Sequence, residues 1–173
     1  QELNYHINTR LLNSVYNFKK TYHVALISQI HVGEFYASFF FGLDQSSKKN
    51  DIILGLYNIE EDVDVVIDLI TSLSNDNLDA AVLFLPSLKE HDYYKIIEET
   101  PSDFFLISAA SLFHPVLDTV TFDAYRGGYL TAKHFEEQGY EEVGFISGPT
   151  YRQEALLRKG GYTDYINHRS DMK

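Results

Sequence analysis

Hydrophobic residues run together or alternate in short stretches along the chain, a pattern typical of strands inside a sheet. Between these stretches lie longer segments whose apolar residues recur every three or four positions, which predicts amphipathic helices. Strand and helix therefore alternate. This order predicts an α/β fold with a mostly parallel sheet flanked by helices. The predicted strands of this sheet are 23–30, 52–57, 80–85, 104–108 and 119–122.

The first predicted helix, residues 34–47, has an aromatic stripe at helical spacing. Such stripes usually pack into a core, and we assign Phe39 and Phe40 to it. For Phe35 and Tyr36, at the start of the helix, core packing and ligand contact both remain open.

The stretch 118–149 reads as strand, turn, helix, turn and strand. Asp123 follows the first of these strands and is predicted to cap the helix 126–138, because an aspartate there accepts backbone N–H bonds. Gly139 suits the left-handed C-terminal cap, and 142–147 is the next predicted strand. Parallel strands joined in this way collect ligands at their carboxyl ends, so Asp123 is also a candidate for ligand contact.

Composition narrows the function. The chain has 173 residues, 45% of them hydrophobic, which is enough for one domain or two small lobes. Its formal charge of −11 makes the body a poor surface for nucleic acid, which needs clustered cations. Residues 1–21 differ, because they are locally basic and rich in asparagine. No apolar run approaches the roughly 20 residues of a membrane span, so no membrane partner is predicted.

Chemistry typical of enzymes is not found in the sequence. Cysteine is absent, and the seven histidines do not have metal-ligand spacing. The carboxylates at 60–62, 64 and 68 fit a solvated helix start better than a metal site, since no calcium-type loop surrounds them. Ser147 lacks the preceding glycine of a nucleophile elbow, and no phosphate-binding glycine loop with a lysine occurs. We therefore predict no cofactor, no metal and no enzymatic activity.

Several motifs together resemble one family. Asp123 is followed by Gly127-Gly128, by Ala132 and His134, and then by the run GFISGP. This order resembles the middle of LacI-type transcriptional regulators, whose effector-binding regions share their fold with periplasmic sugar-binding proteins. Near the N-terminus, LNYHIN resembles the L-G-Y-x-x-N that leads into the hinge helix of these regulators. The resemblance covers essentially the whole chain.

The resemblance implies a two-lobed, periplasmic-binding-protein-like fold with parallel sheets flanked by helices. Residues 1–21 correspond to the hinge or linker, and 22–122 to the first α/β lobe. Residues 123–173 correspond to the start of a second α/β lobe, which is incomplete in this chain. An ordinary amphipathic N-terminal helix remains an alternative for the first segment.

By resemblance, Asp123 faces a sugar in the cleft between the lobes, although the asparagine that usually follows it is Ala124 here. Arg158 satisfies the family's R-x-x-G-Y pattern and donates to sugar hydroxyls, for which a guanidinium fork is well suited. A surface position is the alternative for Arg158.

Three further residues complete the predicted ligand site. Phe35 and Tyr36 keep the aromatic pair of the family and present faces on which a sugar ring stacks. Ser108 is the last residue of the fourth predicted strand. The family often has an aspartate or arginine just after this strand, whereas this chain has no charged residue there.

The sequence thus predicts the ligand-sensing domain of a cytoplasmic LacI-type regulator. Its small-molecule effector is a sugar-like compound held between two lobes, and it contacts DNA through a helix-turn-helix domain not in this chain. The family dimerises through its lobes, so the resemblance also implies a homodimer. The alternative is a periplasmic sugar-binding protein or the sensor domain of a membrane receptor, which share the fold without the DNA role.

Overall fold

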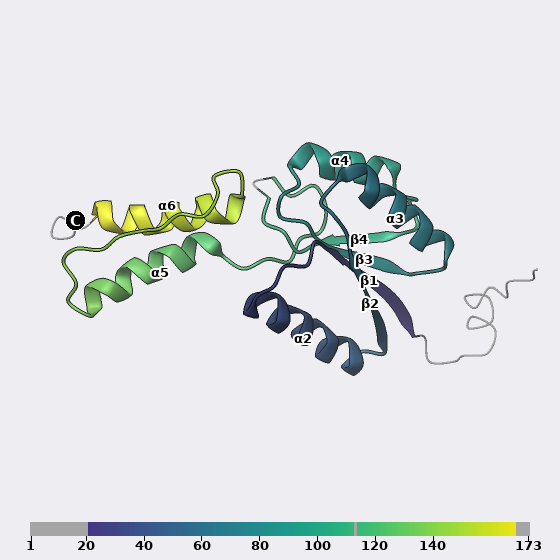
Figure 1. Ribbon diagram of the computed structural model, residues 1–173, viewed down its shortest axis with the longest axis horizontal. Helices are drawn as coiled ribbons and strands as arrows, with labels where there is room; N and C mark the ends of the chain where they lie inside the picture. The colour runs from purple at the N-terminus through teal and green to yellow at the C-terminus, as the bar shows by residue number, and fades with distance from the viewer. Residues whose placement is uncertain (1–20, 113, 169–173) are drawn as a thin grey trace, which may run out of the picture.

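The computed structural model describes residues 21–112 and 114–168. Strands and helices alternate through its first part, and two helices follow without a strand between them (Figure 1). The predicted hinge, residues 1–21, lies outside the described residues except for Thr21. The elements are β1 (Tyr22–Ser28), α2 (Glu34–Lys49), β2 (Ile52–Asn58), α3 (Val63–Asn75), β3 (Ala80–Phe84), α4 (Glu90–Glu99), β4 (Phe105–Ser108), α5 (Ala124–Glu137) and α6 (Gln153–His168).

The four strands form one parallel sheet in the order β2-β1-β3-β4. The register aligns Val24 with Leu54 on one side and with Ala80 on the other, and Ala80 with Phe105. Because every strand runs the same way, all carboxyl ends meet at one edge. The predicted α/β fold is confirmed, and this edge is where ligands of such sheets bind.

Helices cover both faces of the sheet (Figure 1). On one face, Ala25 and Ile27 of β1 pack with Ile70 of α3 and Ile96 of α4, all four completely buried. Helix α2 lies on the other face, where the ring of Phe39 is 5.0 Å from that of Phe84. Each fully buried aliphatic side chain contributes about 1.5–3 kcal/mol, so the α3/α4 face holds the sheet together.

The fifth predicted strand is reduced to a single bridge. Thr119 pairs in parallel with Ser108, supported by bonds from Ser108 N to Asp118 O (2.8 Å) and from Val120 N to Ser108 O (2.9 Å). The chain then leaves the sheet for α5, so the ladder does not continue. The predicted position beside β4 is correct, but the predicted length of 119–122 is wrong.

The predicted strand 142–147 is also wrong, and with it the expectation of a second sheet among the described residues. The segment is extended but has no neighbouring strand in the part of the chain that the structure describes. A strand needs a partner whose backbone groups complete its hydrogen bonds. Phe145 packs on the ring of Tyr162 instead, with centroids 4.8 Å apart.

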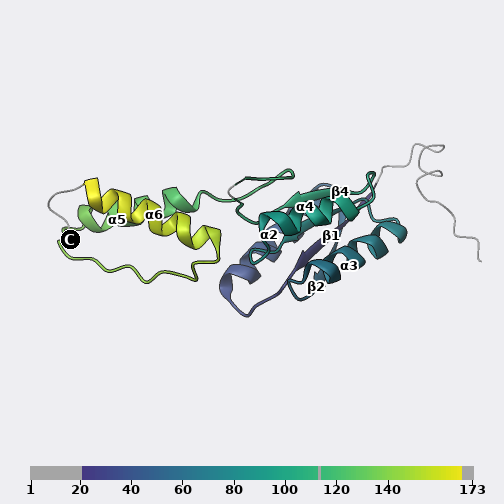
Figure 2. The ribbon, with the colours of Figure 1, turned by 90° about the horizontal axis from the view of Figure 1, so that it is seen from above.

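Helices α5 and α6 run side by side in the same direction, and the segment between them returns along the pair (Figures 1 and 2). They meet through glycines. A Cβ on Gly128 would lie 1.9 Å from the carbonyl oxygen of Arg158, and one on Gly161 would lie 1.9 Å from that of Tyr125. Only glycine permits so close an approach of two backbones.

The α5/α6 pair lies beyond the carboxyl edge of the sheet, joined to it by the segment after β4 (Figure 1). Asp123 caps α5, since its Oδ1 accepts from Arg126 N at 2.8 Å, and Gly139 ends the helix region with a φ of +81°. Both predicted caps are confirmed. Among the described residues, no helix combines the length and apolarity needed to cross a membrane.

Candidate ligand-binding cleft

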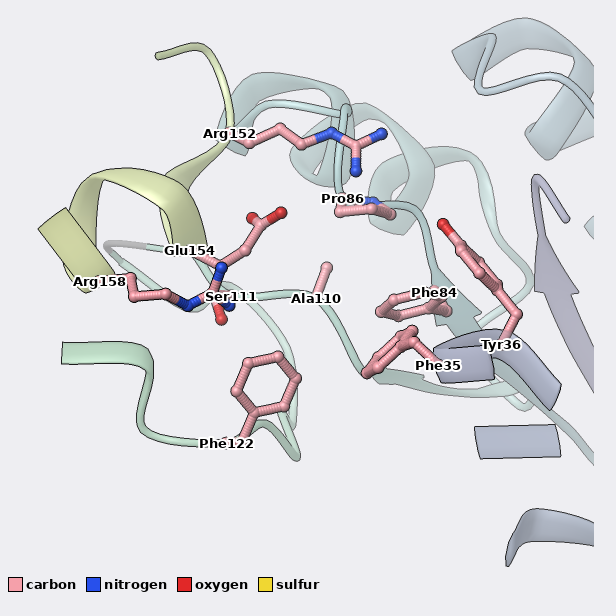
Figure 3. Close-up of a pocket in the computed structure, with 10 residues that line it drawn as sticks. All are labelled: Phe35, Tyr36, Phe84, Pro86, Ala110, Ser111, Phe122, Arg152, Glu154 and Arg158. Atoms are coloured by element: carbon pink, nitrogen blue, oxygen red, sulfur yellow. The ribbon is translucent and has the colours of Figure 1, made fainter. Parts of the chain in front are cut away.

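A cleft of about 200 Å³ lies between the carboxyl edge of the sheet and the start of α6 (Figure 3). Pockets for drug-sized ligands measure about 300–1,000 Å³, so the cleft is small as it is formed by the described residues. Both parts of the molecule contribute to its walls. The lining residues are Phe35, Tyr36, Phe84, Pro86, Ala110, Ser111, Phe122, Arg152, Glu154 and Arg158.

The sheet side of the cleft is an aromatic wall, defined as Phe35, Tyr36, Phe84 and Phe122. Phe84 ends β3, and the rings of Phe35 and Tyr36 from the start of α2 each lie 5.9 Å from it. The ring of Phe122 meets that of Phe35 edge to face at 6.2 Å. Phe35 remains 48% exposed, so part of this wall is accessible to a ligand.

The opposite wall carries charge. Arg152 lies immediately before α6, and Glu154 and Arg158 lie four residues apart on it, which places them on one face of the helix. Figure 3 shows these three side chains across the cleft from Phe84, with Ala110 between the two sides. The polar wall, defined as Arg152, Glu154 and Arg158, is thus directed toward the aromatic wall.

Arg152 also bridges the two parts of the molecule. Its Nη2 donates to Ser87 Oγ at 3.5 Å, and Ser87 N in turn donates to Glu61 Oε2 at 2.5 Å. Its Nε is shielded from solvent and has no hydrogen-bond partner among the described residues. A shielded charged donor without an acceptor is unfavourable, so a shift of this side chain that brings Nε to an acceptor oxygen is favoured.

The structure brings three of the five predicted ligand residues together. Phe35, Tyr36 and Arg158 line the cleft, although they lie far apart in the sequence. Asp123 does not line it, and its carboxylate is engaged in the α5 cap. A ligand role for Asp123 therefore remains a prediction.

Ser108 is completely buried and does not line the cleft. Its Oγ accepts from Ala110 N at 3.1 Å, a local bond that shapes the turn after β4. The nearby Tyr93 is completely buried too and donates to Leu85 O at 3.2 Å. Burial raises the pKa of Tyr93, and the hydrogen bond to Ser108 partly offsets this rise by lowering the pKa. Ser108 thus bonds the backbone of Ala110, which lines the cleft, and does not line the cleft itself.

Sequence reasoning missed most of the lining. Phe84 was part of the predicted strand 80–85, and its place next to the predicted carboxyl end was the available signal, since strand ends point to the ligand edge. Arg152 and Glu154 had no such signal, because their position depends on how α6 docks against the sheet. Glu154 and Arg158 do share helical spacing, which was visible in the sequence.

The arrangement suits binding. The aromatic wall accepts an apolar ring face, the arginines donate hydrogen bonds and the glutamate accepts them. The part of the chain that the structure describes contains no group of three or more His, Cys, Asp or Glu side chains placed to hold a metal. A second hollow of about 300 Å³ shares Pro86 and Ser111 with the cleft.

The sequence matches no protein-family model and no curated protein. The fold is similar to that of an ABC transporter periplasmic solute-binding protein from Actinobacillus succinogenes 130z with bound D-allose, with a TM-score of 0.72, 20% identity, and 88% of this chain and 57% of that chain covered. It is also similar to the lac repressor dimer bound to operator and the anti-inducer ONPF, with a TM-score of 0.70, 14% identity, and 95% and 57% covered.

A third similar structure is a periplasmic binding protein/LacI transcriptional regulator from Alkaliphilus metalliredigens QYMF complexed with D-xylulofuranose. Its TM-score is 0.68 at 19% identity, and the match covers 88% of this chain and 55% of that chain. The chain therefore spans a little over half the length of these proteins. At such identities the similarity shows the fold, which is the periplasmic-binding-protein-like fold common to sugar-binding proteins and LacI regulators.

Proposed function

We propose that this chain is part of the ligand-sensing domain of a LacI-type transcriptional regulator and binds a small sugar-like effector in the cleft. The observation that carries the proposal is the aromatic wall facing the polar wall across the carboxyl edge of the sheet. A sugar ring has an apolar C–H face and a rim of hydroxyls, so it satisfies both walls at once.

Two further findings support the proposal. Sugar ligands occupy two of the similar structures, and a repressor bound to its operator is a third. The motif order around Asp123 and the R-x-x-G-Y pattern at Arg158 resemble the regulators in particular. The proposed regulator acts in the cytoplasm as a homodimer, with DNA contacts made by a helix-turn-helix domain.

The mechanism is a shift between two arrangements of the lobes. A ligand held by the polar wall on α6 and the aromatic wall of the sheet favours the arrangement in which both walls reach it. That preference changes how the two hinge segments of a dimer meet the operator. The acidic body, with a formal charge of −11, does not itself bind DNA.

Calorimetric titration of the full-length protein with a panel of pentoses and hexoses tests ligand binding. For the best ligand, Arg158→Ala removes charge-assisted hydrogen bonds worth about 1.5–3 kcal/mol, so the affinity falls about tenfold to a hundredfold. Lys159→Ala is the control, because Lys159 is exposed on the same helix and does not line the cleft. Equal affinities for the two variants would place the ligand elsewhere.

Operator binding separates the regulator from a periplasmic binder. In a regulator, the sugar changes the affinity of the full-length protein for duplex DNA from its own upstream region, measured at constant salt. Residues 1–173 alone are expected to bind this DNA no better than unrelated sequences. Sugar binding without any effect on DNA binding would support the periplasmic alternative instead.

A further inference from the structure

The net charge of the residues that line the cleft indicates the charge of its ligand. The polar wall contains two guanidinium groups and one carboxylate, and the aromatic wall contains no ionisable carboxylate or amine. The cleft therefore has one positive charge in excess, on a chain whose formal charge is −11. This local positive excess favours an anion at this point, against the repulsion from the acidic remainder of the chain.

Neither guanidinium, of Arg152 or of Arg158, forms an ion pair within 4.0 Å with another residue of the described ranges, 21–112 and 114–168. The weak contact of Arg152 with Ser87 engages only Nη2, and Nε is left shielded from water without an acceptor. An arginine offers donors only, so whatever relieves this atom must be an acceptor.

The surroundings strengthen such a contact. The ring of Phe84 is buried, whereas Phe35 and Phe122 are about half exposed, so water is restricted only on the Phe84 side of the cleft, where charge pairs gain strength. Guanidinium forks bind carboxylate and phosphate oxygens more strongly than they bind neutral hydroxyls. The carboxylate of Glu154 accepts hydrogen bonds from ligand hydroxyls and repels a second negative charge nearby. The cleft therefore favours a ligand with one anionic group and several hydroxyls.

We infer that the effector is an anionic sugar, whose carboxylate or phosphate oxygens bind to Arg152 and Arg158 while its ring lies on the aromatic wall. This inference rests on the proposed sugar-binding function and specifies the ligand class of the same cleft. It also makes Arg152 a ligand-binding residue that, together with Arg158, selects the charged form over the neutral sugar.

The test is a matched panel titrated calorimetrically into the full-length protein. D-glucose, D-galactose and D-fructose are each compared with their 6-phosphate, and D-ribose with its 5-phosphate. D-glucose is also compared with D-glucuronate, and D-galactose with D-galacturonate. The best charged sugar is expected to bind at least about tenfold more tightly than its neutral parent, since one charge-assisted hydrogen bond accounts for that factor. Its affinity falls as sodium chloride is raised, whereas that of the parent does not. The phosphate and acid arms show which group the cleft prefers.

Three arginine variants locate the effect. Arg152→Gln and Arg158→Gln each reduce the preference for the charged sugar about tenfold or more and leave the neutral parent less affected. Arg126→Gln is the control, because Arg126 is exposed on α5 and does not line the cleft. Thermal unfolding without ligand identifies a misfolded variant. If Arg152→Gln does not fold, the Arg158→Gln result decides.

The outcomes separate this inference from the proposed function. A neutral sugar that binds as tightly as its charged derivatives overturns the inference and leaves the sugar-binding function standing. A preference for the charged form that persists in both Arg→Gln variants also overturns it. If no sugar of the panel binds, charged or neutral, the proposed function fails and the inference fails with it.

Discussion

The close contact between α5 and α6 predicts that Gly128→Ala lowers the free energy of unfolding. Gly128→Ala would place its Cβ 1.9 Å from Arg158 O, 2.8 Å from Arg158 C and 3.0 Å from Tyr162 N. Real Cβ atoms do not approach heavy atoms within 3.0 Å, so the helices must separate by about 1 Å. The obstacle is backbone on both sides, and no side-chain rotation relieves it.

The magnitude follows from two opposing effects. Overpacking costs about 1–3 kcal/mol, and a collision between backbones belongs at the upper end. Replacing a helical glycine by alanine gains about 1 kcal/mol when space permits. At Gly127, the neighbour in sequence, an added Cβ would meet open space, with no obstructing atom within 4 Å, so Gly127→Ala gains stability. Because both glycines lie inside α5, the helical gain applies to both variants, and their free energies of unfolding are expected to differ by the overpacking cost alone, about 3 kcal/mol.

Urea denaturation followed by circular dichroism measures this difference. The reciprocal pair on α6 repeats it, since Gly161→Ala meets Tyr125 O at 1.9 Å while Gly160→Ala meets only a ring carbon at 3.8 Å. If Gly128→Ala were as stable as Gly127→Ala, the close crossing of α5 and α6 would be wrong. Equal stabilities of Gly161→Ala and Gly160→Ala would contradict the close crossing independently.

One smaller prediction concerns a helix cap, and another concerns a buried tyrosine. Asp123→Ala removes the α5 cap and costs about 1 kcal/mol in the free energy of unfolding, whereas Asp123→Asn keeps it and weakens only the ligand if Asp123 contacts one. Because burial raises the pKa of Tyr93 in the folded state, the neutral phenol is favoured there, and stability is full below about pH 10 and falls as the pH rises above it. Denaturation series across this range should show a shallower fall for Tyr93→Phe, and equal slopes would contradict the assignment.

The sheet and its helices were predictable because their signals are local. Runs such as 80–85 are apolar throughout, as strands covered on both faces must be, and helix caps depend on residues within one turn. Asp123 and Gly139 adopt the predicted cap conformations for that reason. The prediction of a strand at 142–147 was wrong because a strand forms only beside a partner strand. Whether a partner is present depends on residues outside 142–147.

The cleft was predictable only in part. The resemblance predicted Phe35, Tyr36 and Arg158, which the structure brings to one cleft, and their contact with a ligand stays a prediction. Arg152 reaches Ser87 across 65 positions of sequence, and that contact depends on how α6 docks. Ser108 has the right position at the end of β4 but turns inward, because its hydroxyl bonds the local backbone.

The glycine crossing and the cleft are connected through α6. The carbonyl that prevents a side chain at Gly128 belongs to Arg158, whose own side chain lines the cleft. Because the two backbones touch, α5 and α6 are expected to move together. Under the proposed mechanism, a ligand then acts on the distance between the aromatic wall and the side chains of Glu154 and Arg158 on α6. Widening the crossing by Gly128→Ala should weaken ligand binding even though no ligand contact is removed, and calorimetry on that variant, with Gly127→Ala as its control, measures this coupling.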